Sequence, residues 1–296
     1  MSHEWIRLKE RSNDFWLGII VWIALNIGRP IARALLYPIA AYFLIFSDRN
    51  PSEQWFSRVF GRRPSWRDLF RHYLIFSETI LDRVFVFVGR DDFFKLDLHG
   101  LDILDHYVRQ NRGLLLVGAH MGSFEILRAL GKSRKGLDIK AMIYRENSPK
   151  TNSIFRRLNP ALFDETMDMG SPAALLGLDE HIGQGGVAAM LGDRSVHGEK
   201  RVLCRFLGGD AWFPASPALL ASLVKAPVLM FFCLWRGDAH YEIHFELLAD
   251  RIDLNRSRRN AELQQWMQRY AERVEHHAIS APYNWFNFYD FWDLRS

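Results

Sequence analysis

The sequence contains little cysteine and no pattern typical of a disulfide-rich or zinc-ribbon domain. Its two cysteines, Cys204 and Cys233, stand far apart and form no C-x-x-C pair. That arrangement argues against a disulfide framework and favours a reducing compartment. Internal repeats, low-complexity segments and flexible linkers are also missing, so we expect a helical N-terminal portion to pack on one larger domain.

Charge of one sign is not in large excess either. The net charge is +4 over 296 residues and the pI is about 9.1, which favours a partner with anionic groups without naming it. We expect no nucleic-acid partner. Aromatic residues are abundant by contrast, at 14% with ten tryptophans. Interfacial membrane proteins use such residues as anchors, although a large aromatic core gives the same composition.

The longest apolar stretch, Phe15–Phe46, is interrupted by Arg29, Pro30 and Arg33. Each remaining piece falls short of the ~20 residues that a bilayer-spanning helix needs. We therefore predict two apolar helices that lie in one leaflet, with both arginines at headgroup level. A buried helical hairpin is the alternative. The mixed-charge flank before the stretch, with no small-residue cleavage site after it, fits a cleaved signal peptide poorly.

Beyond residue 60, strand-like runs alternate with helical patterns. Such alternation predicts an α/β fold with a mostly parallel central sheet flanked by helices. The domain prediction is an N-terminal apolar membrane-associating segment at 1–60 and an α/β domain at 61–296. The predicted strands are Leu114–Val117, Ile139–Ile143, Val187–Leu191 and Val228–Leu234, with a half-exposed strand near an edge in "AHYEIHFELL". The predicted helices are Ser123–Leu130, Ser148–Leu158, Ser171–Ile182, Pro214–Lys225 and a long C-terminal helix.

A histidine and a glutamate follow the first of these strands in "GAHMGSFE". On a continuous helix His120 and Glu125 would point about 140° apart. If His120 instead ends the strand and Glu125 lies in the first helical turn, the carboxylate can reach the imidazole, and Gly118 and Gly122 permit the tight turn. A carboxylate on one ring nitrogen leaves the other nitrogen as a general base. The alternative is a capping glutamate beside a buried histidine.

Three ordered blocks carry a resemblance to a known family. "GAHMGSFE" resembles the H-x-x-x-x-(D/E) motif of bacterial lysophospholipid acyltransferase-like enzymes, in the branch of the lipid A late (secondary) acyltransferases. "AMIYRENSPKTNSIFRRLN" and "GGVAAMLGDRSVHGEKRVLCRFLGGDAWFPASPALLA" are similar to the next two blocks of that branch. An apolar N-terminal anchor is also usual there. The matching positions in the second and third blocks are Tyr144, Arg145, Asn147, Pro149, Asp193, Phe206, Gly208 and Pro214.

The resemblance implies transfer of a fatty acyl group from an acyl-carrier-protein or coenzyme A thioester to a hydroxyl, at the cytoplasmic face of the inner membrane. His120 would remove the acceptor proton, and Glu125 would orient His120 and stabilise its charged form. No bound cofactor or metal is implied, because the thioester is a co-substrate. The predicted oxyanion- or substrate-binding residues are Gly122, Tyr144, Arg145, Asp193, Arg194, Lys200 and Arg201.

Two further features leave alternatives open. Arg194, Lys200, Arg201 and Arg205 form a basic cluster that can hold phosphates of a lipid, cofactor or carrier protein, or can be a solvated loop. The aromatic and acidic C-terminus, "NWFNFYDFWD", departs from the tryptophan and basic residues common in the lipid A enzymes. We therefore keep pigment (aryl polyene) lipids and glycolipids as alternative acceptors beside lipid A.

The rival functions are a thioesterase or lipid hydrolase, and a non-catalytic lipid- or carrier-binding protein of the same fold. Ser123 lies outside any G-x-S-x-G motif, so a serine nucleophile is unsupported. In "HYEIH", His240 and His244 share one face of a strand with Glu242, and we expect no zinc there.

Overall fold

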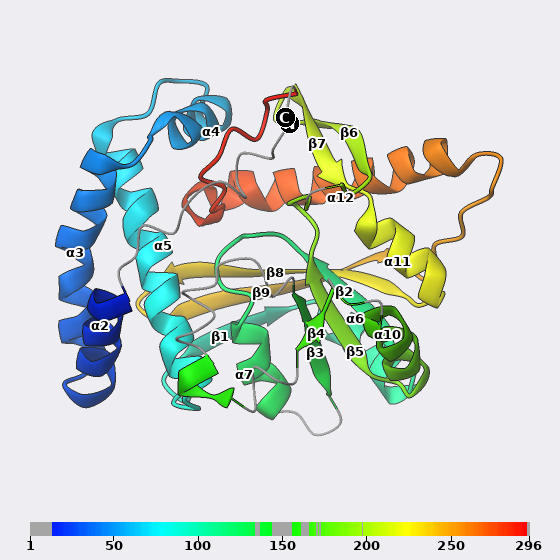
Figure 1. Cartoon of the computed structure of the whole chain (residues 1–296), viewed down its shortest axis with the longest axis horizontal. Helices are drawn as coiled ribbons and strands as arrows, with labels where there is room; N and C mark the ends of the chain where they lie inside the picture. The colour runs from blue at the N-terminus through cyan, green and yellow to red at the C-terminus, as the bar shows by residue number, and fades with distance from the viewer. Residues whose placement is uncertain are drawn as a thin grey trace.

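The computed structural model describes residues 14–133, 137–143, 156–160, 166–169, 171, 173–196 and 198–294. Most of this chain forms an α/β domain, drawn in Figure 1. The helices are α2 (Asp14–Asn26), α3 (Arg29–Phe46), α4 (Asn50–Phe60), α5 (Trp66–Phe87), α6 (Leu101–Arg109), α7 (Ile126–Ser133), α10 (Ala173–Gly183), α11 (Ser216–Val224), α12 (Arg259–Ser280) and the 3₁₀ turn η1 (Pro282–Asn284). The strands are β1 (Lys95–His99), β2 (Leu114–Gly118), β3 (Ile139–Ile143), β4 (Met167–Asp168), β5 (Val187–Leu191), β6 (Arg201–Phe206), β7 (Gly209–Pro214), β8 (Val228–Gly237) and β9 (His240–Ala249).

A seven-stranded sheet in the order β1-β9-β8-β2-β5-β3-β4 forms the centre of the molecule. Every neighbouring pair in it is parallel except β8 and β9. The predicted fold class is confirmed. β6 and β7 form a separate antiparallel hairpin.

Apolar side chains cover both faces of the sheet, because successive residues of a strand point to opposite sides. In β2, Leu115 and Val117 belong to the core beneath α12 and the β6–β7 hairpin, whereas Leu114 and Leu116 belong to the core beneath α6 and α7. Figure 1 shows α12 and α7 on opposite sides of the sheet. This burial on both faces explains why the inner strands read as continuous hydrophobic runs.

The N-terminal helices pack against α5 instead of standing apart from the domain. Arg29 pairs with Asp82 at 2.8 Å and Arg33 with Glu78 at 2.9 Å, so both arginine charges are compensated by carboxylates of α5. The break between the helices falls just before Arg29, at Gly28, whose φ of 129° favours glycine. The two predicted helices are present, but Arg29, Pro30 and Arg33 lie within α3 and not between the helices, because proline is well accommodated in a first helical turn.

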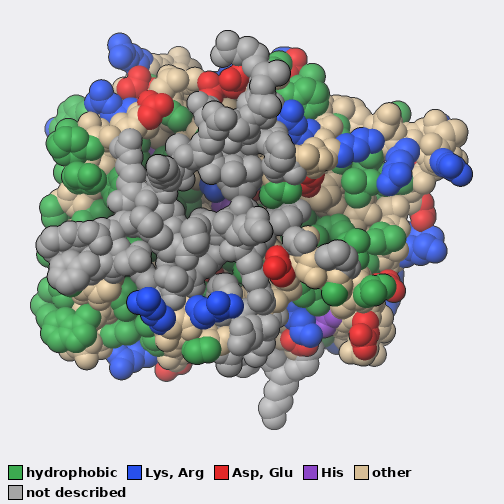
Figure 2. Space-filling model, viewed as in Figure 1, with side chains coloured by type: hydrophobic (Ala, Val, Ile, Leu, Met, Phe, Trp, Pro, Cys, Tyr) green, Lys and Arg blue, Asp and Glu red, His purple; other side chains and the backbone are tan. Residues whose placement is uncertain are grey.

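Helix α3 is long and apolar enough to cross a membrane, judged by its 18 residues and composition alone. Large apolar side chains of α2, α3 and the turn between them remain exposed, and hydrophobic groups gather at this edge in Figure 2. They are Trp22, Ile27, Ile31, Leu35, Tyr37, Tyr42, Ile45 and Phe46. We call this set the outer apolar face.

Two details of the structure differ from the sequence expectation. α7 begins at Ile126, because Ser123 donates its backbone N–H to Cys233 O at 3.1 Å and the next two residues form a turn. β9 is the second strand of the sheet, because β1 forms the edge beside it, and the sequence analysis did not assign β1 as a strand. Most of the expected helix at 148–158 lies outside the described residues. The division of the chain at residue 60 stays a prediction.

Candidate functional site

The turn after β2 approaches neighbouring backbone too closely for a side chain. Gly122 has a φ of +60°, and a Cβ atom there would collide with the carbonyl oxygen of Cys233. A Cβ on Gly118 would lie 2.6 Å from the Phe231 ring. The two glycines therefore let the chain leave the sheet sharply and present His120 between them.

His120 is held by the carboxylate of Asp193. Its Nδ1 lies 2.7 Å from Asp193 Oδ1, and its backbone N–H donates to Oδ2 at 3.1 Å. Both residues follow the carboxyl ends of neighbouring parallel strands, β2 and β5, which meet at one edge of the sheet. Because Nδ1–H donates to the carboxylate, the Nε2 atom carries the lone pair.

Within the described part of the chain, Nε2 of His120 makes no hydrogen bond, and the side chain is partly exposed. The His120 side chain is 30% exposed, whereas the Asp193 side chain is fully buried. A buried carboxylate behind a half-exposed imidazole is the arrangement expected of a general base.

Glu125 does not make the expected contact with His120. Its Oε2 lies 2.8 Å from Nε of Arg83 on α5 and accepts a hydrogen bond from Ser123 Oγ at 3.2 Å. Glu125 sits in the turn before α7, and its buried carboxylate is balanced there by the Arg83 charge. The sequence expectation placed a carboxylate on the imidazole, but in the structure that carboxylate belongs to Asp193, which follows β5, and not to Glu125 in the turn before α7.

The C-terminal segment closes over this turn. Asn287 Nδ2 donates to Asp193 Oδ2 at 3.1 Å, and Arg194 donates to Asn287 Oδ1 at 2.7 Å and to Phe286 O at 2.6 Å. Phe286 in turn donates its backbone N–H to His120 O at 2.9 Å. Sequence reasoning missed Asn287, although a polar residue between aromatic ones in "NWFNFYD" is a signal that it serves a buried partner.

The site favours a neutral imidazole and an ionised carboxylate. Burial lowers the pKa of His120 below its usual value, and the positive charge of Arg194 lowers it further, while Asp193 opposes both. Burial alone would raise the pKa of Asp193, but His120 and Arg194 outweigh it and hold that pKa at about 2. His120 can therefore accept a proton near neutral pH.

Of the other predicted site residues that the structure describes, Gly122 lies in the His120 turn, whereas Lys200 and Arg201 lie elsewhere. The backbone N–H of Gly122 donates to Asn284 O at 2.9 Å and is not available to a substrate oxygen in this arrangement. Lys200 donates to Asn260 Oδ1 at 2.6 Å, and Arg201 lies over the Trp212 ring at 5.1 Å, both beside the β6–β7 hairpin. Tyr144 and Arg145 lie outside the described residues.

The expected basic cluster is thus divided. Arg194 is engaged by the C-terminal segment next to the imidazole, and Arg205 pairs with Asp210 at 3.0 Å on the hairpin. Through these contacts Arg194 holds the C-terminal segment beside the site. Phosphate binding by Lys200 and Arg201 stays a prediction.

Comparison with known proteins assigns the chain to a family. No curated protein matches the sequence. Residues 2–293 match the family described as bacterial lipid A biosynthesis acyltransferase, which covers nearly the whole chain and includes the His120 turn, Asp193 and the closing C-terminal segment. Membership at this coverage supports an acyltransferase. The chain therefore belongs to the bacterial lipid A biosynthesis acyltransferase family.

Proposed function

We propose that this protein transfers a fatty acyl group from an acyl-carrier-protein or coenzyme A thioester to a hydroxyl of a lipid or glycolipid acceptor. The observation that carries the proposal is a partly exposed His120 whose Nδ1 is bound to buried Asp193, which leaves Nε2 free of that contact. The family match over residues 2–293 supports acyl transfer as the reaction class.

His120 acts as the general base of this reaction. Nε2 takes the proton of the acceptor hydroxyl while its oxygen attacks the thioester carbonyl carbon. The tetrahedral oxyanion collapses, the carbon–sulfur bond breaks, and the proton on His120 passes to the leaving thiolate. The products are an ester and a free thiol, with no acyl-enzyme between them.

Asp193 and Glu125 serve this base in different ways. Asp193 holds the productive tautomer and stabilises the imidazolium that forms, as the carboxylate of a catalytic triad does. Glu125, paired with Arg83, fixes the start of α7 behind the turn and acts as a positioning residue. Because the backbone N–H of Gly122 is bound to Asn284 O, we propose Arg145, the other candidate from the sequence, as the hydrogen-bond donor to the oxyanion. Lys200 and Arg201 are proposed to bind an anionic group of a substrate.

The proposed site of action is the cytoplasmic face of the inner membrane. The outer apolar face of α2 and α3 supports contact with a lipid surface, because so large a set of exposed apolar side chains is unusual on a soluble monomer. A protein bound to the membrane through this face could take its acceptor from the lipids of that membrane.

The test measures thioester consumption and acceptor acylation with purified full-length variants whose melting has been checked. His120→Ala should lower the transfer rate by ~10²–10⁴-fold, and Asp193→Asn by up to ~10⁴-fold. Ser123→Ala is the control and should keep substantial activity. A folded His120→Ala protein with near wild-type transfer would exclude the mechanism. Equal thioester loss with and without acceptor would identify a hydrolase instead.

A further inference from the structure

A row of imidazole and carboxylate side chains runs along the sheet where β1 meets β9. In β9 the residues at 240, 242, 244 and 246 share one face, because side chains alternate along a strand. The parallel register sets Asp97 beside Glu242 and His99 beside His244. Two strands that are far apart in sequence therefore place three potential metal ligands together: His99, Glu242 and His244.

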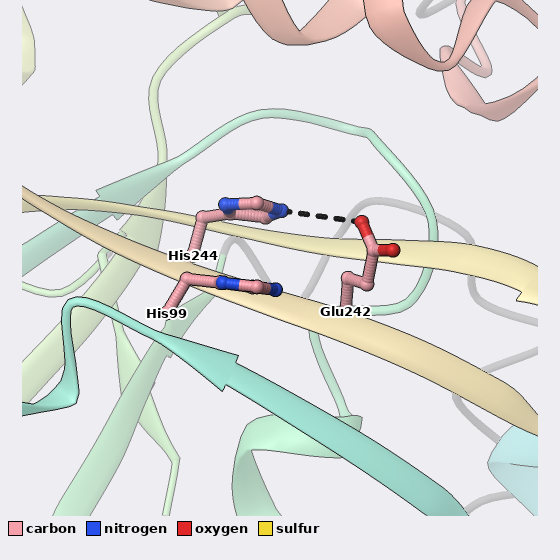
Figure 3. A group of neighbouring side chains, drawn as sticks. All are labelled: His99, Glu242 and His244. Atoms are coloured by element: carbon pink, nitrogen blue, oxygen red, sulfur yellow. Dashed lines mark hydrogen bonds and ion pairs between the residues drawn. The ribbon is translucent and has the colours of Figure 1, made fainter.

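The rings of His99 and His244 extend toward the Glu242 side chain, as Figure 3 shows. The rings of His99 and His244 are stacked with centroids 4.5 Å apart and an interplanar angle of 14°. His244 Nε2 lies 3.5 Å from Glu242 Oε2. One nitrogen or oxygen atom of each residue lies within 4.8 Å of the other two.

We propose that His99, His244 and Glu242 form a binding site for a divalent transition metal, of which Zn²⁺ fits the ligands best. Zinc binds imidazole nitrogen and carboxylate oxygen at ~2.0–2.2 Å in a tetrahedron, so its ligand atoms lie roughly 3.3–3.5 Å from one another. The His244–Glu242 spacing already has this value, and small side-chain rotations bring His99 into range. Two histidines and one glutamate leave the fourth position to water.

Neighbouring groups both support the site and compete with it. His277 donates to Glu246 at 2.8 Å, and its ring centroid lies 4.9 Å from that of His244. His277 therefore packs beside His244 but is not one of the three proposed ligands. Arg236 lies 2.7 Å from Glu242 Oε2 and competes with a cation for that carboxylate. His99 is exposed and the other two are half-buried, so a metal ion enters directly from solvent.

This site is separate from the proposed acyl-transfer chemistry. It uses none of the residues around His120, and it is the one such group found among the residues that the structure describes. The sequence analysis considered His240 and His244 with Glu242 on one strand and expected no zinc there. His240 is instead bound to Asp97 at 2.7 Å, and the ligand that completes the set comes from β1.

The experiment uses the full-length protein without a polyhistidine tag, stripped with a chelator and titrated with Co²⁺ and Zn²⁺ near pH 7.5. We expect one equivalent of Co²⁺ with visible absorption bands of tetrahedral ligation, their replacement by Zn²⁺, and a higher melting temperature with Zn²⁺. His99→Ala and His244→Ala should each weaken binding by at least ~10²-fold. The controls His106→Ala and His240→Ala should bind as the wild type does.

Arg236→Ala adds a test in the opposite direction. Because it frees Glu242 from its arginine partner, it should tighten Co²⁺ binding, by ~10-fold. His99 is exposed, so an unchanged melting temperature of metal-free His99→Ala separates ligand loss from misfolding. Absence of stoichiometric Co²⁺ binding to the wild type would overturn the proposal. Binding that persists in both His99→Ala and His244→Ala would overturn it as well.

Discussion

At the scale of single residues, the two carboxylates near the His120 turn make different contacts, and only that of Asp193 is bonded to the imidazole. Asp193 touches Nδ1 and raises the pKa of His120 against the effects of burial and Arg194. Asp193→Asn should therefore move the acid limb of the kcat/KM profile to lower pH as well as reduce the rate, because His120 then loses its proton more easily. Glu125→Gln should move that limb much less, since Glu125 is bound to Arg83.

The measurement is kcat/KM from pH 5 to 8 for both variants and the wild type. A shift caused by Glu125→Gln with none from Asp193→Asn would mean that Glu125 is the partner of His120 in the working enzyme. That result would restore the arrangement expected from the H-x-x-x-x-E spacing.

His72 gives a residue-scale prediction for stability. It is fully buried, with Nε2 2.9 Å from Trp285 O and Nδ1 3.2 Å from Ser52 Oγ, and burial lowers its pKa to about 4. Between pH 6.5 and 4 the unfolded chain binds a proton at this position and the folded chain does not. Stability should therefore fall as the pH drops through this window, by roughly 3 kcal/mol from His72 alone.

Thermal melts from pH 7.5 to 4.5 test this expectation. His72→Gln removes the titrating ring and should flatten the dependence of the melting temperature on pH, whatever its stability at neutral pH. His106→Gln, which changes an exposed histidine, should keep the wild-type slope. An unchanged slope in His72→Gln would assign the acid sensitivity to other groups.

At the scale of elements, a buried ion pair fastens α3 to α5. Arg29 Nε donates to Asp82 Oδ1 at 2.8 Å, and Tyr241 on β9 donates to Asp82 Oδ2 at 2.8 Å. Arg29→Ala leaves the carboxylate of Asp82 buried with its charge uncompensated, which should lower the free energy of unfolding by ~3–5 kcal/mol. Urea unfolding of the detergent-solubilised protein measures this loss.

Two further variants separate the charge from the packing. Arg29→Ala combined with Asp82→Asn removes the stranded charge and should recover part of the loss. Arg205→Ala breaks an exposed pair with Asp210 and should cost less than ~1 kcal/mol. Equal losses for Arg29→Ala and Arg205→Ala would show that the buried pair contributes little to holding α3.

The elements that the sequence predicts well are those whose signal is local. The strands Ile139–Ile143 and Val187–Leu191 match their predicted bounds, because each is a short and mainly apolar run, and Val187–Leu191 is almost entirely buried. The partners of His120, Arg29 and His99 were not predictable in this way. Each pairs with a residue on an element far away in the chain, and only the register of the sheet and the packing of α5 bring the partners together.

The site could be predicted in part, because some of its signals are local. The glycines around His120 and the apolar run before it located the turn, since both belong to one short segment. The choice between Glu125 and Asp193 depends on the order of strands, which places β5 next to β2. A single sequence holds no direct signal for that neighbour relation.

At the scale of the whole molecule, the outer apolar face lies on one side of the protein (Figure 2). Its side chains are exposed, so they add little to folding and remain available to a lipid surface. Because the arginines at the start of α3 are paired within the protein, this face can enter a leaflet without carrying their charges into hydrocarbon. Membrane binding should therefore depend on the apolar side chains more than on those arginines.

The test replaces Ile31, Leu35 and Ile45 together by serine in the full-length chain and measures partition onto phospholipid vesicles. Each apolar side chain of this size contributes on the order of 1 kcal/mol when half-buried, so the partition coefficient should fall by ~10²-fold, with little change in melting temperature. The control replaces Leu176 and Leu223, exposed apolar residues of α10 and α11, and should bind as the wild type does. Equal binding by both variants, or a wild-type protein that stays in solution at low salt, would show that α2 and α3 do not hold the protein on the membrane.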